Sequence, residues 1–291
     1  MESVYLPQNK PLQLVSRERV LDLAEPVVMG ILNCTPDSFS DGGRFVSVDL
    51  ALAQAERMIG EGALIIDVGG ESTRPGALPV SVSEEIDRVL PLIERLRGTH
   101  PVWISIDTLK PEVMDAACAA GADMINDVRA LLAPGAVEVA ARHRVAVCLM
   151  HMKGEPQTMQ QAPCYQHVTT DVRRFLQQRL DTCVDAGIPV QRIVLDPGFG
   201  FGKTLEHNLQ LLAELPDLVE LGPPLLAGLS RKSMFQQLLG LNVGERLHAS
   251  VAAATLAVWQ GASIIRAHDV RATVEAVRFA SAVTRATQKA G

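Results

Sequence analysis

The feature of this sequence that most constrains its fold is an alternation of short apolar runs and helical segments. Eight runs lack regular polar alternation, and each is followed by polar or glycine-rich residues and then by a segment of helical periodicity. They are VVMGIL (27–32), LIIDV (64–68), VWISI (102–106), DMIN (123–126), VAVCLM (145–150), RIVL (192–195), PLLAGL (224–229) and SIIR (263–266). Such runs are typical of buried parallel strands in βαβ units. Eight units favour a (β/α)8 TIM barrel over the alternative, a doubly wound open sheet.

The segments between the runs predict the outer helices and a single barrel domain. Helices are expected near residues 49–60, 83–97, 111–120, 134–143, 165–186, 205–214, 245–259 and 271–288. No linker rich in Pro and Ser divides the 291 residues, so the barrel is expected to span residues 27–291. Residues 1–26 are expected to form an N-terminal hairpin or lid on the barrel bottom. One large barrel of this length is within the usual range for the fold.

Composition and charge narrow the location and the partners. Aromatic residues make up only 4% of the chain, which suits an aliphatic barrel interior. The net charge of −6 argues against nucleic acid held by a general positive field, although local cations around a small anion remain allowed. We expect no membrane partner and no secretory signal. The five scattered cysteines, without a CxxC pair, indicate reduced thiols in a cytoplasmic protein rather than a zinc site.

Polar side chains stand at or directly after the end of every apolar run. In chain order they are Asn33, Asp67 with Glu71 and Arg74, Asp107, Asn126 with Asp127, His151, Asp196, Ser230 with Arg231 and Lys232, and Arg266 with His268. The carboxyl ends of barrel strands meet at one rim, where active sites of this fold are built. A single such residue could cap a strand end by accepting a backbone N–H. Eight in succession favour a functional rim.

Three short motifs are set aside. Asn33 begins a formal glycosylation sequon, which carries no weight without a secretory signal. GFGFGKT (198–204) resembles a P-loop, but the spacing would need a glycine where Pro197 stands. We therefore expect a flexible loop, in which an ordinary solvated side chain explains Lys203 as well as a functional role does. HMKGEPQTMQ (151–160) is better explained as a long βα loop than as a metal site.

An ordered set of strings gives the sharpest signal. It consists of MGILNCTPDSFSDGG (29–43), DVGGESTRPGA (67–77), SIDT (105–108), INDV (125–128), LMHMKG (149–154), LDPGFGFGK (195–203), GLSRKS (228–233) and RAHDV (266–270). Together they resemble the dihydropteroate synthase family of folate biosynthesis, from Met29 to the end of the eighth strand. The resemblance implies a transferase that uses Mg²⁺. Such an enzyme condenses 6-hydroxymethyl-7,8-dihydropterin diphosphate with 4-aminobenzoate to give 7,8-dihydropteroate and pyrophosphate.

The same resemblance implies roles for individual residues. The expected catalytic groups are Lys232, Asp107, Asp196, Arg266 and His268. Substrate binding would use these five together with Thr73, Arg74, Pro75, Asn126, Met150, Phe201, Gly228, Ser230 and Phe39, and Asn33 would ligate Mg²⁺. The implied mechanism is dissociative: the bond to the diphosphate breaks first, carboxylates stabilise the resulting pterin cation, and the arylamine then attacks.

The loops that hold several of these residues are expected to close over the substrates. TPDSFSDGG (35–43) and STRPGA (72–77) are polar and rich in glycine, and we expect them to complete an aminobenzoate pocket with Phe39, Pro75, Phe201 and Ser230. Sulfonamides are then expected inhibitors. The departures from the family pattern are Cys34 and Ala267, where a larger aliphatic residue is common.

Two other functions remain open at this stage. The pterin-binding barrel of corrinoid-linked methyltransferases shares the ring-recognising polar groups, although it needs neither a diphosphate site nor an aminobenzoate pocket. An inactive paralogue that only binds pterin is the non-enzymatic alternative. The resemblance also implies a homodimer, and the Ala-rich helix around residues 248–259 could pack against a partner or equally well within the chain.

Overall fold

The barrel strands coincide with the predicted apolar runs. The computed structural model describes residues 12–34, 44–72, 79–154, 159 and 163–289. Its barrel strands are β3 (Val27–Asn33), β4 (Ile65–Gly69), β5 (Trp103–Asp107), β6 (Met124–Asp127), β7 (Ala146–Met150), β8 (Ile193–Asp196), β9 (Leu226–Ala227) and β10 (Ile264–Ala267). They form one parallel sheet in the order β8-β7-β6-β5-β4-β3-β10-β9. A bridge between Leu195 and Leu225 links the two end strands. The predicted (β/α)8 barrel is confirmed.

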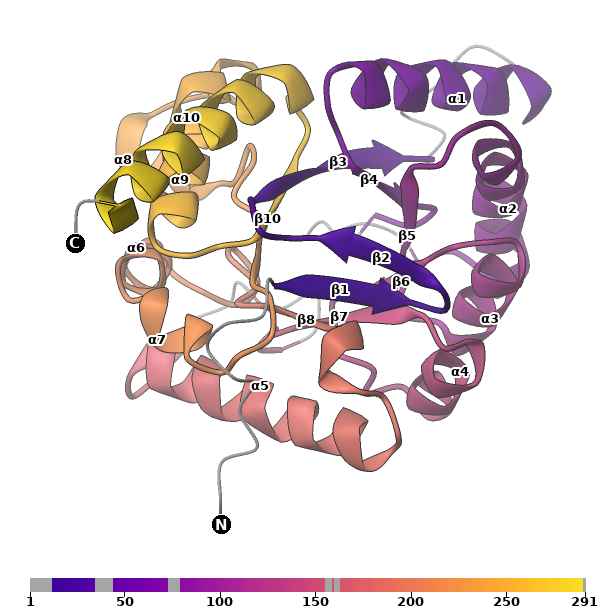
Figure 1. The fold of residues 1–291 in the computed structure, drawn as a ribbon, viewed down its shortest axis with the longest axis horizontal. Helices are drawn as coiled ribbons and strands as arrows, with labels where there is room; N and C mark the ends of the chain where they lie inside the picture. The colour runs from indigo at the N-terminus through magenta and orange to yellow at the C-terminus, as the bar shows by residue number, and fades with distance from the viewer. Residues whose placement is uncertain (1–11, 35–43, 73–78, 155–158, 160–162, 290–291) are drawn as a thin grey trace.

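The helices surround the barrel (Figure 1). They are α1 (Arg44–Gly60), α2 (Val82–Thr99), α3 (Pro111–Ala119), α4 (Ala136–His143), α5 (Val168–Asp185), α6 (Leu205–Ala213), α7 (Pro216–Val219), α8 (Met234–Leu239), α9 (Leu247–Trp259) and α10 (Val270–Lys289), with short 3-10 turns η2 (Val190–Arg192) and η3 (Val243–Glu245). Each predicted helix is present, although α1 begins earlier than expected. The short helices α7 and α8 were not predicted, because neither is long enough to establish a helical period.

Local signals in the sequence fix where several helices begin. The Ser81 hydroxyl accepts the Glu84 N–H at the start of α2, and Pro111 occupies the first position of α3. At α6 the Thr204 hydroxyl accepts the His207 N–H while the His207 ring accepts the Thr204 N–H. This reciprocal cap ends the glycine-rich loop that follows β8 and so defines one edge of the rim.

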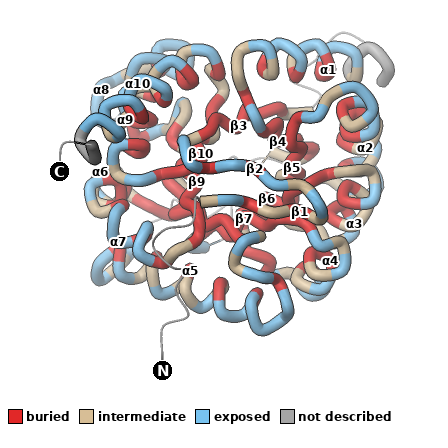
Figure 2. Tube along the Cα trace, in the orientation of Figure 1, coloured by how far each residue is buried: buried red, intermediate tan, exposed pale blue. Residues whose placement is uncertain are grey.

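Two apolar layers hold the barrel together. The larger cluster lies between the strands and the helices, and a second cluster fills the barrel interior with residues such as Met29, Ile65, Trp103 and Ile264. Figure 2 shows the barrel strands buried over most of their length and the outer helical faces exposed. This double burial explains why the strands lack polar alternation.

An N-terminal hairpin lies across the amino end of the barrel (Figure 1). It consists of β1 (Gln13–Ser16) and β2 (Arg19–Asp22), and its Leu14 and Leu21 belong to the interior cluster. The Arg19 guanidinium donates to the buried Asp123 carboxylate at 2.6 Å, which anchors the hairpin to β6. The hairpin therefore covers the barrel end opposite the carboxyl rim. The domain boundary near residue 26 stays a prediction.

Candidate active site

A pocket opens at the carboxyl ends of the strands, with an empty volume of about 350 Å³ that includes space open to solvent. Eight of the residues predicted from the sequence line it, namely Asp107, Asn126, Met150, Asp196, Phe201, Gly228, Lys232 and Arg266. Val128, Gly198 and Phe199 complete the lining.

The strand register explains why these residues meet. Asn33 on β3 pairs with Gly69 on β4, Gly69 pairs with Asp107 on β5, and Asp107 pairs with Asn126 on β6. Further round the barrel, Met150 on β7 pairs with Asp196 on β8. Polar residues that are far apart in the sequence therefore project from neighbouring strands at the same rim.

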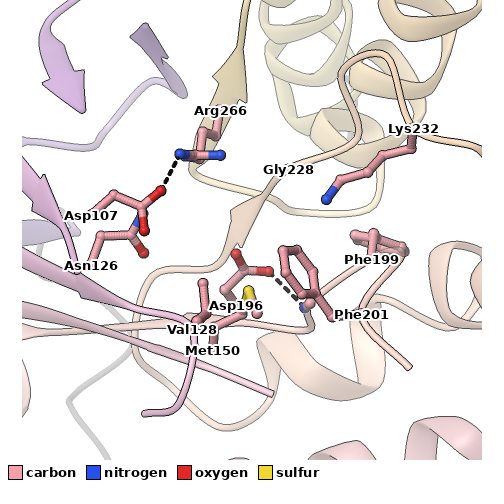
Figure 3. A pocket seen from close by; sticks show the side chains of 11 residues that line it. Asp107, Asn126, Val128, Met150, Asp196, Phe199, Phe201, Gly228, Lys232 and Arg266 are labelled. Carbon is pink, nitrogen blue, oxygen red and sulfur yellow. Dashed lines mark hydrogen bonds and ion pairs between the residues drawn. The ribbon is translucent and has the colours of Figure 1, made fainter. Parts of the chain in front are cut away.

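Arg266 joins two buried carboxylates. Its Nε donates to Asp67 Oδ2 and its Nη2 donates to Asp107 Oδ2, both at 2.6 Å. Asn126 Nδ2 donates to the same Asp67 oxygen at 3.0 Å, while Asp67 Oδ1 has no hydrogen-bond partner among the described residues. Figure 3 shows the Arg266 guanidinium on one side of the pocket, reaching towards Asp107. The network fixes the guanidinium plane and the Asn126 amide before any ligand binds.

Burial and charge shift the pKa values of this network. Burial raises the pKa of Asp107 to about 7, against the opposing effect of Arg266 and with a further rise from the negative charge of Asp67. For Arg266, burial acts to lower the pKa, but Asp67 and Asp107 together hold it above its usual range. Arg266 is thus a permanent cation, whereas the Asp107 carboxyl changes its charge near neutral pH.

Asp196 and Lys232 lie on the other side of the pocket (Figure 3). Asp196 Oδ1 accepts the Gly198 N–H at 2.7 Å. Burial raises the pKa of Asp196, and the Gly198 N–H, Lys232 and Arg266 oppose the rise. Lys232 Nζ lies 4.2 Å from the centroid of the Phe201 ring, in a cation–π contact. The pocket thus has a carboxylate, an ammonium and an aromatic face within one small space.

Ser230 and His268 form a pair beside the pocket, outside its lining. The Ser230 hydroxyl lies 3.0 Å from His268 Nδ1 and also accepts the His268 N–H at 3.2 Å. The adjacent Arg231 and Asp269 form a two-point ion pair through Nε and Nη2. These contacts join the segment after β9 to the segment after β10, so both residues are held at the rim.

Asn33, the predicted Mg²⁺ ligand, stands at the end of β3. A side chain built at Gly69 would lie 3.8 Å from both Asn33 Oδ1 and Asp107 Oδ2, so these oxygens flank the same small space. In the described part of the chain no group of three or more His, Cys, Asp or Glu residues is placed to hold a metal. A single amide oxygen suits Mg²⁺ only when phosphate and water supply most of the other ligands.

Other predicted residues cannot be placed, and one of the two explanations for Lys203 is wrong. Phe39, Thr73, Arg74 and Pro75, with most of their loops, lie outside the described residues. Lys203 is not a solvated side chain: it is 3% exposed and bonds to backbone carbonyls and to His151, because the loop folds back onto the end of β7.

Two strand-end carboxylates, Asp67 and Asp127, had no predicted role. Asp67 anchors Arg266 and Asn126, and its position at a strand end was the available signal. For Asp127, the capping explanation holds, since its carboxylate accepts the N–H groups of Arg129 and Leu131.

The fold and the pocket define a barrel enzyme whose site, at the carboxyl rim, can bind a flat polar ring next to an anion. A family model described as "Pterin binding enzyme" matches residues 29–268. Dihydropteroate synthase of Escherichia coli strain K12 is 52% identical over 277 residues, which cover 95% of this chain and 98% of that protein.

Two solved structures agree with this match. The Yersinia pestis dihydropteroate synthase in complex with a sulfonamide drug has a TM-score of 0.89 at 52% identity, covering 94% of this chain and 99% of that one. The Xanthomonas albilineans dihydropteroate synthase with 4-aminobenzoic acid has a TM-score of 0.89 at 51% identity, with the same coverage. The chain belongs to the pterin-binding enzyme family and, within it, to the dihydropteroate synthases, which are transferases.

Proposed function

We propose that this chain condenses 6-hydroxymethyl-7,8-dihydropterin diphosphate with 4-aminobenzoate to give 7,8-dihydropteroate and pyrophosphate. The observation that carries the proposal is the convergence of Asp107, Asn126, Asp196, Lys232 and Arg266 on one pocket. High identity to dihydropteroate synthases over nearly the whole chain supports it and argues against the methyltransferase alternative. We expect sulfonamides to compete with the arylamine, as the Yersinia pestis complex suggests.

The pocket groups suit the polar edge of a pterin. That edge presents N–H donors beside a carbonyl acceptor, and leaving such groups unpaired in a buried site costs about 1–3 kcal/mol each. Asp196 would accept the donors, because the carboxylate oxygen not bonded to Gly198 faces the pocket (Figure 3). Lys232 would donate to the ring acceptors. The Asn126 amide would donate one hydrogen bond to the ring and accept one from it. The Arg266 guanidinium would lie along the ring with its N–H groups near the diphosphate.

The chemistry we propose is heterolysis of the bond to the diphosphate, followed by attack of the arylamine nitrogen. The carboxylates of Asp107 and Asp196 stabilise positive charge on the ring as the bond breaks, while Arg266 and His268 stabilise the departing diphosphate. These groups are held in position by the protein beforehand, so little reorganisation is needed at the moment of reaction. The arylamine nitrogen then forms the new C–N bond and releases its proton.

Mg²⁺ would bind at Asn33, and its charge would stabilise the leaving diphosphate. A neutral amide oxygen at the rim fits an ion that takes most of its ligands from phosphate and water. The Asn33 side chain itself would orient the diphosphate on the β3 side of the pocket, next to Asp107.

A direct assay tests the proposed function. Purified protein, the pterin diphosphate, Mg²⁺ and 4-aminobenzoate are mixed, and dihydropteroate is measured by chromatography. We expect product that requires both substrates and is lost on chelation of Mg²⁺, with competitive inhibition by a sulfonamide. Pterin binding without formation of dihydropteroate would support the inactive paralogue. Methyl transfer from methyltetrahydrofolate would support the methyltransferase hypothesis.

The pKa of Asp107 predicts an acid limit to turnover. Since burial raises this pKa to about 7, Asp107 becomes neutral below that pH and stabilises a ring cation less well. We expect kcat/KM, which reports the pKa values of the free enzyme, to fall by about tenfold per pH unit well below the limit. Asp67→Asn removes a charge that raises the Asp107 pKa, so the limit should move to lower pH. A kcat/KM profile from pH 5 to 9 for both proteins checks this, and an unmoved limit would contradict it.

We also propose a homodimer that uses α8, α9 and α10, which lie together in Figure 1. Large apolar side chains are exposed on these helices: Leu238, Leu239, Leu256, Trp259 and Phe279. Exposed apolar groups on adjoining elements are typical of subunit contacts. Sedimentation at micromolar concentration should give a dimer that Trp259→Glu dissociates and that Leu132→Glu, a matched change after β6, leaves intact. A monomeric wild-type protein would refute the dimer.

A cytoplasmic location is the last part of this proposal. All five cysteines have free thiols, and Cys118, Cys148 and Cys183 are buried, as suits a reducing compartment. None of the described helices is long and apolar enough to cross a membrane.

A further inference from the structure

Lys203, which follows the glycine-rich loop after β8, is buried in an unusual way. Its Nζ lies 2.9 Å from the Gly198 carbonyl oxygen, 3.2 Å from the Phe201 carbonyl oxygen and 2.9 Å from His151 Nδ1. In its protonated form this group has three N–H donors, and these three acceptors match them. Burial lowers the pKa of Lys203 to about 7, against the opposing effect of Asp196 and with a further lowering from Lys232. Buried lysines are rare unless they are well bonded, and here the close partners are neutral.

His151 is suited to act as the third acceptor. Burial, and after it the positive charge of Lys203, lower the pKa of its ring to about 2, so the ring is neutral. With Nδ1 accepting from Lys203, the ring hydrogen is assigned to Nε2. Phe175 packs edge-on against the ring, with centroids 5.0 Å apart. The imidazole therefore stays in place at the end of β7.

The loop held by Lys203 lies directly on the end of β7. A Cβ atom at Gly198 would fall 1.9 Å from the His151 carbonyl oxygen, and one at Gly202 would fall 2.2 Å from the Lys153 carbonyl oxygen. Both glycines have φ angles in the left-handed region, at 70° and 63°. Tyr165 Oη also donates to the Gly202 carbonyl at 2.8 Å. Side chains are excluded along this contact, so the backbone path of the loop is closely defined.

The opposite face of the same loop forms part of the pocket. The Gly198 N–H donates to Asp196 Oδ1 at 2.7 Å, and the Phe201 ring lies 4.2 Å from Lys232 Nζ. Lys203 thus holds the carbonyl groups of the same two residues that touch the carboxylate and the ammonium of the site. Its side chain connects the buried His151 to the pocket wall.

We propose that Lys203 is a positioning residue, whose ammonium fixes Gly198 and Phe201 and thereby orients Asp196 and Lys232 for the pterin ring. It acts through these residues and does not itself touch the substrate. When Lys203 is protonated, its positive charge also favours the ionised form of Asp196, and this contribution is lost as the pH rises through about 7. The proposal rests on the proposed function for its kinetic readout, but pterin binding tests it without turnover.

A double-mutant cycle distinguishes positioning from a general structural role. Lys203→Met keeps an apolar side chain of similar length and removes the charge and the donors. If Lys203 acts through Phe201, we expect Lys203→Met to lower kcat/KM by about 10- to 100-fold in the wild-type background. The loss should be smaller when Phe201→Ala is already present, because the route through the Phe201 ring is then gone and only the route through Gly198 remains. A merely structural residue would cause the same loss in both backgrounds.

Pterin binding provides the second readout. Calorimetric titration with pterin-6-carboxylic acid should show about tenfold or greater weakening in Lys203→Met. The matched control is Arg271→Met, which also replaces a cation by methionine but at an exposed position on α10, and which should stay within about twofold of wild type in binding and turnover. If Lys203→Met does not fold, as judged by circular dichroism and thermal unfolding, Lys203→Gln takes its place in the same cycle.

The outcomes separate the two proposals. Absence of dihydropteroate formation by the wild-type protein would refute the proposed function alone. Unchanged pterin affinity, or equal losses of kcat/KM with and without Phe201→Ala, would refute the positioning role of Lys203 while leaving the proposed function intact.

Discussion

Asp196→Asn and Lys232→Ala should each lower kcat by about 10²–10³-fold while the protein stays folded. Asparagine retains the oxygen that accepts the Gly198 N–H, so the loop should keep its conformation. What it loses is the negative charge that stabilises the ring cation. Lys232→Ala removes the ammonium above Phe201 and hence a donor to the ring acceptors.

Steady-state kinetics with both substrates, together with thermal unfolding, checks this result. The exposed residues Asp185 and Lys153 supply the controls Asp185→Asn and Lys153→Ala, which make the same chemical changes outside the pocket. Turnover near the wild-type level in both pocket variants would overturn the assignment of the ring-binding groups.

Arg266→Met should destabilise the protein by about 3–5 kcal/mol, because it leaves two buried carboxylates without their shared cation. Asp67 and Asp107 both bond to this guanidinium at 2.6 Å. In the double variant Asp67→Asn/Arg266→Met one of the two charges is gone, so much of the stability should return. The exposed Arg271, in an i,i+4 pair with Glu275, provides the control Arg271→Met.

The pH dependence of this variant has a definite sign. The positive charge of Arg266 opposes the rise in the Asp107 pKa that burial causes. Without Arg266, the pKa of Asp107 therefore rises further. A folded-state pKa above the unfolded value means that the folded protein binds more protons, and stability then falls as pH rises through that interval. The loss measured by urea unfolding should therefore be larger at pH 8 than at pH 5. An equal loss at both pH values would contradict this explanation.

The sequence predicted the barrel well because parallel strands buried on both faces have an unmistakable pattern. Most strands nevertheless end one residue later than the apolar run, as with Asn33, Asp107 and Asp196. The apolar pattern ends at the polar side chain, but the hydrogen-bonded pairing of the strand backbones includes that residue as well. This is why these polar groups are held by strands rather than by loops, and why their side chains are so well placed.

The contacts that the sequence missed depend on residues far apart in the chain. Nothing near Lys203 indicates that its loop folds onto His151, which directly follows a different strand, β7. Asp67 was visible as a strand-end carboxylate, but its role follows only from Arg266, at the other end of the barrel sequence. The ring-binding residues were identified through family resemblance, and the register explains why they converge.

The seam between β8 and β9 has a consequence for how this enzyme can diversify. In the described part of the chain these strands share one backbone bridge, Leu195 to Leu225, whereas the other strand pairs form ladders. Asp196 ends β8 on one side of the seam, and Lys232 follows β9 on the other. The gap between them is therefore set by side chains and loops rather than by ladder hydrogen bonds, so substitutions there can change the fit to the ring without disturbing the strand ladders.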